Sequence, residues 1–241
     1  MKVSIVVPAF NEERLLAQSL ASIRAASAAF TDARWTMELI VCDNNSTDRT
    51  AAIAAAAGAI VVAESVNQIS RARNAGAAHA TGDWLLFIDA DSFPTRELFA
   101  DVVEAIGDRR CIAGGSTVRI DLDGVLYNLA LRWWNRVSRT LKWAAGSFVF
   151  CETSVFREVG GFTEKLYAAE EINLFRRLKR LARRRGRSIV ILHRHPLLTS
   201  GRKAHLYTPR EMLRFWLRTT LSGGRTLQDP QESFPWYDGR R

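Results

Sequence analysis

Two aspartates, Asp89 and Asp91, stand one residue apart directly after the apolar segment WLLFI at 84–88. An apolar segment of this length is typical of a buried strand. Hard divalent cations such as Mg²⁺ and Mn²⁺ take oxygen ligands, usually one or two carboxylates completed by phosphates of a substrate. The pair is therefore a candidate site for a metal and a diphosphate. Its alternative role is to cap the turn that precedes Pro94.

Carboxylates also follow two other apolar segments. Glu12 comes shortly after VSIVV, and Asp43 comes directly after LIVC. A second acidic pair, Glu170-Glu171, opens a segment with helical periodicity. Carboxylates at that position favour the positive end of the helix dipole.

The first half of the chain alternates between apolar runs and helical segments. Asn11 is a candidate N-cap followed by two glutamates, Gly58 is a stop signal, and Thr95 is a second candidate N-cap. This alternation indicates βαβ units, and hence an α/β fold with a doubly wound, mostly parallel sheet and helices on both faces. The expected strands cover 3–7, 39–42, 59–63 and 84–88, and the expected helices start at Asn11, 47–48, 70 and Thr95.

The carboxyl ends of the expected strands define the candidate site. Ligands of open parallel sheets bind beyond these ends. Glu12, Asp43, Asp89 and Asp91 all follow expected strands. We therefore expect several strand ends to converge on one acidic crevice.

The second half of the chain is less regular. It contains helical segments at 124–143 and 168–185, a strand SIVIL at 188–192, and the capping-box sequence TPRE at 208–211. No internal repeat is evident, which favours a single domain.

The charge of the chain is basic. It has 34 Lys and Arg against 25 Asp and Glu, a formal charge of +9. A basic surface favours phosphates, anionic lipid or nucleic acid, but an acidic crevice would repel a nucleic-acid backbone, so no nucleic acid is expected. Three cysteines without a CxxC spacing predict free thiols. With no apolar span or signal peptide evident, we expect a cytoplasmic protein.

Six motifs occur in a characteristic order: VSIVVPAFNEERLL, VCDNNSTDRT, RARNAGAAHATGDWLLFIDAD, GSFVF, VGGF and AAEEINLFRRL. Together they resemble the family 2 glycosyltransferases, which have the GT-A fold, over about residues 1–185. The resemblance implies an inverting transfer of a sugar from a nucleotide diphosphate-sugar to an acceptor hydroxyl, with Mg²⁺ or Mn²⁺ on the DxD motif. Residues 1–110 would bind the nucleotide-sugar and metal, 111–222 would form the acceptor-side half of the same domain, and 223–241 would be a tail.

The resemblance also implies roles for single residues. A UDP-sugar is favoured because the family's aspartate that matches Asp43 binds uracil. Asp91 would be the main metal ligand, and Asp89 would approach the ribose or the metal. The residues expected at the nucleotide are Pro8, Phe10, Glu12, Asp43, Arg71, Arg73, Asn74 and Asp89.

The acceptor side is implied in the same way. Glu171 would be the general base, and Glu170 is the other member of the acidic pair. The family's acceptor-side loop corresponds to Gly146, Ser147 and Phe148.

Late basic residues supply further candidates. Family members often carry a late histidine that helps to bind metal or diphosphate, and His195 or His193 fits that place. Arg202 and Lys203 can clamp a diphosphate when a loop closes, or they can belong to a solvated basic loop. The chain departs from the family where Asp43-Asn44-Asn45 replaces the frequent Asp-Asp-Gly. One acidic contact is therefore missing, which leaves the identities of the nucleobase and the sugar of the donor open.

The segment 124–143 combines a leucine stripe with tryptophans and arginines. Such a helix suits a lipid headgroup layer, which would make the protein peripheral at the inner face of the membrane with a lipid-linked acceptor of the bacterial cell envelope. Packing on the sheet with a basic outer face explains the pattern too, and the acceptor is then a sugar or another hydroxyl compound. The residues concerned are Tyr127, Trp133, Trp134, Trp143, Arg132, Arg136, Arg139 and Lys142.

Two alternative functions stay open. One is a catalytically inactive protein that binds a nucleotide-sugar. The other is a nucleotidyltransferase, which would usually have a glycine-rich phosphate loop after the first strand, where this chain has PAFNEE.

Overall fold

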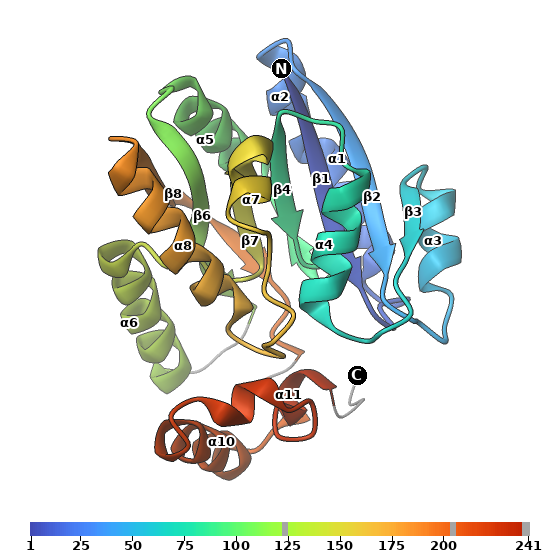
Figure 1. The fold of residues 1–241 in the computed structure, drawn as a ribbon. Coiled ribbons are helices and arrows are strands. Elements are labelled where there is room, and N and C mark those ends of the chain that lie inside the picture. The colour runs from blue at the N-terminus through green and yellow to red at the C-terminus, as the bar shows by residue number, and fades with distance from the viewer. Residues whose placement is uncertain (122–124, 203–205, 238–241) are drawn as a thin grey trace.

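The computed structural model describes residues 1–121, 125–202 and 206–237, without the side chains of 125–128, 209, 213, 216, 235 and 236. Its centre is an eight-stranded sheet in the order β3-β2-β1-β4-β7-β6-β8-β5 (Figure 1). Strands β1 to β4 pair in parallel, β7 runs antiparallel between β4 and β6, and β6 pairs in parallel with β8. The mostly parallel sheet that the sequence predicts is confirmed.

The strands predicted in the first half and the strand at 188–192 are all present. Three strands were not predicted: β5, β6 and β7. Strand β6 contains the pair Gly114-Gly115, which weakens any strand pattern, and the other two are short. The strand bounds are β1 Lys2–Ala9, β2 Thr36–Asp43, β3 Ile60–Ala63, β4 Trp84–Ile88, β5 Ser92–Phe93, β6 Cys111–Ile120, β7 Phe148–Glu152 and β8 Ser188–Thr199.

Helices cover both faces of the sheet, and each face has its own apolar core (Figure 1). One core contains residues of α1, α2 and α5, and the other contains residues of α4, α7 and α8. The helix bounds are α1 Leu16–Ala26, α2 Ala28–Asp32, α3 Thr50–Ala56, α4 Ile69–His79, α5 Arg96–Gly107, α6 Val125–Leu141, α7 Thr153–Glu158, α8 Glu170–Arg184, α10 Pro209–Leu221, the 3₁₀ helix η1 Arg225–Gln228 and α11 Phe234–Tyr237.

The predicted caps have different outcomes. The Thr95 side chain accepts a hydrogen bond from Leu98 N at the start of α5, and Thr208 forms the capping box of α10. The prediction for Asn11 is wrong, because α1 begins at Leu16. Asn11 has a positive φ of 51° and its side chain accepts a hydrogen bond from Thr47 N, so it ties the loop after β1 to the loop after β2.

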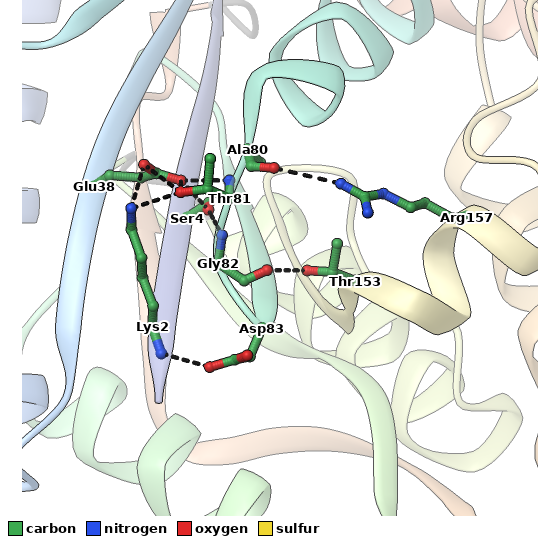
Figure 2. Close-up of polar contacts among 9 residues, drawn as sticks. All are labelled: Lys2, Ser4, Glu38, Ala80, Thr81, Gly82, Asp83, Thr153 and Arg157. Atoms are coloured by element: carbon green, nitrogen blue, oxygen red, sulfur yellow. Dashed lines mark hydrogen bonds and ion pairs between the residues drawn. The ribbon is translucent and has the colours of Figure 1, made fainter.

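The connection from α4 to β4 is fixed at the amino end of the sheet (Figure 2). Ser4 Oγ donates to Glu38 Oε1 at 2.5 Å, Lys2 Nζ lies 2.7 Å from Glu38 Oε2, and Thr81 N also donates to Glu38. Burial by itself would raise the pKa of Glu38, but these hydrogen bonds lower it to about 2. Gly82 passes so close that a Cβ there would lie 2.6 Å from Ser4 Oγ, so this turn requires glycine.

The two predicted halves share one sheet, because β7 of the second half pairs with β4 of the first. The segment expected to be a tail contains η1 and α11, and α11 lies below the carboxyl ends of the first strands (Figure 1). Cys42, Cys111 and Cys151 are buried free thiols, as predicted. None of the helices in the described ranges has the length and apolar character needed to cross a bilayer.

Candidate active site

A pocket lies at the carboxyl ends of β1 and β4. Five residues predicted for the nucleotide and the metal line it: Pro8, Phe10, Glu12, Asp89 and Asp91. The other lining residues are Ala9, Asn44, Asn67, Ile69, Ala90 and Tyr237. The sequence argument from strand ends therefore locates this pocket.

The backbone around the two aspartates is well anchored. Asp89 N donates to Ser147 O at 3.2 Å, and Ser92 N donates back to Asp89 O at 3.1 Å. Ser200 N donates to Asp91 O at 3.0 Å. Asp91 is 9% exposed, and the Asp89 side chain is 25% exposed. Two neighbouring carboxylates that line one pocket are the donor set that Mg²⁺ or Mn²⁺ takes when phosphates and water complete its coordination. No cluster of three or more acidic, histidine or cysteine ligands occurs within the described part of the chain.

Arg73 lies beneath the pocket and is 1% exposed. Its Nη2 is 2.8 Å from Asp89 Oδ1 and 2.8 Å from Gly146 O, and its Nη1 is 2.5 Å from Glu170 Oε1. Burial by itself would lower the pKa of Arg73, but the charges of Asp89, Glu170 and Glu171 raise it, so the guanidinium stays charged. One buried cation thus joins the DxD motif, the 144–147 loop and the acidic pair.

The acidic pair opens α8, as predicted. Ala169 precedes the helix in the left-handed conformation, with φ 60°, and Glu170 turns inward to Arg73. Glu171 lies at the 144–147 loop: a Cβ on Gly146 would lie 3.6 Å from Glu171 Cδ. Burial, followed by the charge of Glu170, raises the pKa of Glu171 to about 8. A carboxyl with this pKa can accept a proton at neutral to mildly alkaline pH.

The raised pKa of Glu171 predicts a pH-dependent stability. Because the folded protein holds the proton of Glu171 more tightly than the unfolded chain, this group adds to the free energy of unfolding at low pH. The contribution is complete below the ordinary pKa of 4.5 and is lost as the pH rises through about 8. Chemical denaturation at about pH 6 and about pH 9 should show a larger loss of unfolding free energy in the wild type than in Glu171→Gln. Equal losses in both proteins would contradict the assigned pKa.

The side chains of Arg71 and Asn74 contact protein groups around the segment that leads into α8. Arg71 Nη1 lies 2.9 Å from Glu164 Oε2. Asn74 Nδ2 donates to Phe162 O at 2.9 Å, and Asn74 Oδ1 accepts from Phe162 N at 2.9 Å. Gln68 Nε2 donates to the carbonyl oxygen of Glu164 at 2.8 Å. Arg71 and Asn74, expected at the nucleotide, thus hold the segment that leads to the acidic pair, and their contact with a nucleotide stays a prediction.

Three other predicted residues do not line the pocket. Asp43 is half-buried and accepts from Ser46 N at 3.3 Å, while its neighbour Asn44 lines the pocket. Phe148 is fully buried in the core of the sheet, directly after the 144–147 loop, and its assignment to the acceptor side stays a prediction. His195 Nδ1 lies 3.1 Å from Asp101 Oδ2 on α5, so the structure does not bring His195 to the pocket of Asp89 and Asp91.

His193 lines a different cavity, which lies between α5, α6 and β8. Both histidines fall in a register shift of β8 against β6, between the pairs Ser116–Leu192 and Val118–Leu197. The extra residues on β8 are all exposed there. The histidines therefore lie within β8, and neither lines the pocket of Asp89 and Asp91.

Two later segments close around the pocket. Arg202 Nη2 lies 2.7 Å from Glu12 Oε1 and 2.9 Å from Glu12 Oε2. Tyr237 of α11 lines the pocket, its hydroxyl oxygen accepts from Ile69 N at 3.2 Å, and its ring packs edge-on against Tyr167. Arg202 was a candidate from the sequence as part of a basic segment, whereas no sequence pattern indicated Tyr237. Lys203 lies outside the described residues.

Solved structures share this fold at low sequence identity. The mannosyltransferase PcManGT from Pyrobaculum calidifontis, in complex with GDP-Man and Mn²⁺, matches with a TM-score of 0.67 at 18% identity, over 98% of this chain and 67% of that chain. TarS of S. aureus matches with a TM-score of 0.64 at 21% identity, over 86% of this chain and 62% of that chain. The fold is therefore GT-A, as expected.

Curated relatives match part of the chain at higher sequence identity. An uncharacterized glycosyltransferase of Mycobacterium tuberculosis is 42% identical over 89 residues, or 37% of this chain and 36% of that protein. A TPR repeat-containing protein of Synechococcus elongatus is 41% identical over 91 residues, or 37% of this chain and 20% of that protein. These matches thus span 20–36% of the curated relatives. The model of the family described as Glycosyl transferase family 2 matches residues 4–158, and the chain therefore belongs to glycosyl transferase family 2.

Proposed function

We propose that this protein is an inverting glycosyltransferase that moves a sugar from a nucleotide diphosphate-sugar to an acceptor hydroxyl. The observation that carries the proposal is the contact of buried Arg73 with both Asp89 of the DxD motif and Glu170 of the acidic pair. This contact fixes a donor-binding carboxylate on one side of Arg73 and, on the other side, the acidic pair to which the proposed base Glu171 belongs. Such a fixed arrangement is what a direct displacement at a sugar carbon needs.

The donor belongs in the pocket at the carboxyl ends of β1 and β4. Asp91 and Asp89 would hold Mg²⁺ or Mn²⁺, which neutralises the charge that develops on the leaving diphosphate. TarS of S. aureus, which shares this fold, has been crystallised with UDP and with UDP-GlcNAc, and the mannosyltransferase PcManGT with GDP-Man and Mn²⁺. We favour a UDP-sugar, as the resemblance of the Asp43 motif implies.

Glu171 is the proposed base. Its carboxylate takes the proton of the acceptor hydroxyl as that oxygen forms a bond to the anomeric carbon. The bond between the anomeric carbon and the diphosphate oxygen breaks on the opposite face, so the configuration inverts. Glu170 and Asp89 are each paired with Arg73 and so are not free to take a proton. We therefore assign the proton transfer to Glu171.

Arg202 is the proposed partner of the diphosphate. In the structure its guanidinium contacts Glu12 at the rim of the pocket through two distances below 3 Å. A guanidinium can donate two parallel hydrogen bonds to a phosphate as it does to a carboxylate, and a diphosphate carries more negative charge than a single carboxylate. We propose that Arg202 moves from Glu12 to the diphosphate when the donor enters.

The donor site predicts a metal-dependent thermal shift. With a nucleoside diphosphate at about 100 times its Kd, the melting temperature should rise by about 5–10 °C, because ligand binding contributes about 2.7 kcal/mol. UDP, GDP, CDP and dTDP are compared with and without Mn²⁺. Asp91→Asn should lose the metal-dependent part of the shift.

Asp108→Asn is the matched control, because Asp108 is an exposed aspartate outside the pocket. It should keep the full shift. An unchanged shift in Asp91→Asn would contradict its role as metal ligand. A shift without any measurable transfer would favour the inactive nucleotide-sugar binder instead.

A further inference from the structure

Helix α6 presents an apolar stripe to the outside of the protein. Leu129, Trp133 and Leu141 recur at multiples of four residues and are 54%, 68% and 43% exposed. The sheet is covered by a different face of the helix. Leu131 and Trp134 pack on one core, and the Asn135 side chain makes two hydrogen bonds with the backbone of Val118. The stripe that would ordinarily face the core is therefore left on the surface.

Arginines flank this stripe on the same exposed side. Arg132, Arg136 and Arg139 of α6 are all exposed. Helix α8 lies beside α6, because Lys179 Nζ donates to Leu141 O and the Arg176 guanidinium lies 5.9 Å from the ring of Trp143 (Figure 1). The exposed side of α8 is basic as well, with Arg176, Arg180, Arg183 and Arg184.

Within the described ranges, these arginines form no ion pairs, although Arg139 lines a cavity that also contains Asp101, Glu104 and Asp108. By contrast, Arg185 and Arg187 next to them pair with Glu158 and Glu152. Burial, together with the charges of Arg183, Arg176 and Lys142, lowers the pKa of Lys179. The surface therefore carries a concentrated positive charge that an anionic partner would relieve.

We infer that α6 and the exposed side of α8 dock on an anionic lipid bilayer, with the α6 stripe inserted among the headgroups. Exposed leucine and tryptophan between arginines match the apolar and charged layers of such a surface. A nucleic acid would use the arginines but would leave the leucines in water. Of the aromatic residues predicted as membrane anchors, Trp133 is exposed, while Trp134 and Trp143 pack against the cores.

The docking surface adjoins the proposed acceptor side. Helix α6 ends at Leu141, and the chain then enters the 144–147 loop that lies beside Glu171. If the proposed function holds, docking brings this loop close to the headgroups, which suits an acceptor whose sugar is attached to a lipid. The docking itself does not depend on transfer, so it can be tested without any activity assay.

The test is flotation of the full chain with vesicles. Vesicles of phosphatidylglycerol and phosphatidylcholine in roughly equal amounts should carry the protein, and pure phosphatidylcholine vesicles should not. Arg132→Gln, Arg136→Gln and Arg139→Gln together should weaken binding about 100-fold, because each arginine near an anionic surface contributes about fivefold. Trp133→Phe should remove the quenching of tryptophan fluorescence by brominated lipid.

The matched control replaces three exposed arginines on other elements, Arg34, Arg49 and Arg96, by glutamine. It removes the same charge and should bind as the wild type does. The melting temperature of each variant shows that it is folded. Equal weakening in both triple variants, no flotation of the wild type, or tighter binding to a DNA duplex than to vesicles would each overturn the inference.

Discussion

Glu171→Gln should lower kcat for sugar transfer by about 10²–10⁴-fold, the range that general-base catalysis contributes. Glutamine keeps the shape of the side chain but cannot take the proton of the acceptor hydroxyl. Donor binding should persist, because Glu171 lies at the 144–147 loop and does not line the nucleotide pocket. The loss should therefore appear in kcat, with a small change in the KM of the donor.

The pH profile separates a base from a structural residue. In the wild type the rate should rise with pH up to about 8, the pKa to which burial and then Glu170 raise Glu171, and then reach a plateau. The residual activity of Glu171→Gln should lack this rise. Glu158→Gln, an exposed glutamate on α7, is the control and should match the wild type. Full activity in Glu171→Gln would sink the assignment.

Arg73→Met should destabilise the protein by about 3–5 kcal/mol, the cost of breaking a buried ion pair from one side. The substitution keeps a long apolar side chain in the core but leaves Glu170 and Asp89 without their cation. For a chain of this size the melting temperature should fall by roughly 10 °C. Glu170, which is 4% exposed, would then hold a charge with no partner at its Oε1.

Arg71→Met is the matched control, two residues away on α4. Its ion pairs to Glu64 and Glu164 are partly exposed, and such pairs contribute about 0–1 kcal/mol. Adding Glu170→Gln to Arg73→Met should recover part of the lost stability, because the second change removes the orphaned charge. Equal effects of the Arg71 and Arg73 variants, or no recovery in the double variant, would contradict the role of Arg73.

Local patterns in the sequence determined the α/β frame and the place of the pocket. Apolar runs such as VSIVV and WLLFI are typical of strands covered on both faces, and the residues that follow parallel strands lie at one edge of the sheet. Glu12, Asp89 and Asp91 follow such runs and do line one pocket. The Thr95 cap and the Thr208 capping box were also predictable from local sequence, because a cap depends on residues three positions apart.

The partners of long side chains were decided only by the tertiary structure. Arg73 and Glu170 are 97 residues apart, and Ile69 and Tyr237 are 168 apart, so no local period connects them. The sequence around Arg73 does not distinguish an arginine that binds a phosphate from one that pairs with a buried carboxylate. The fold selects the carboxylates, because a buried guanidinium must be paired.

The orientation of α6 was decided in the same way. Its leucine stripe suits either packing on the sheet or contact with lipid, and in the structure Asn135 and Trp134 reach the sheet while the stripe stays outside. A periodic pattern states which residues share a face of a helix. Which face meets the sheet depends on the groups that the sheet presents, here the backbone N–H and C=O of Val118 in β6. Those groups are set by the whole fold and not by the sequence of α6.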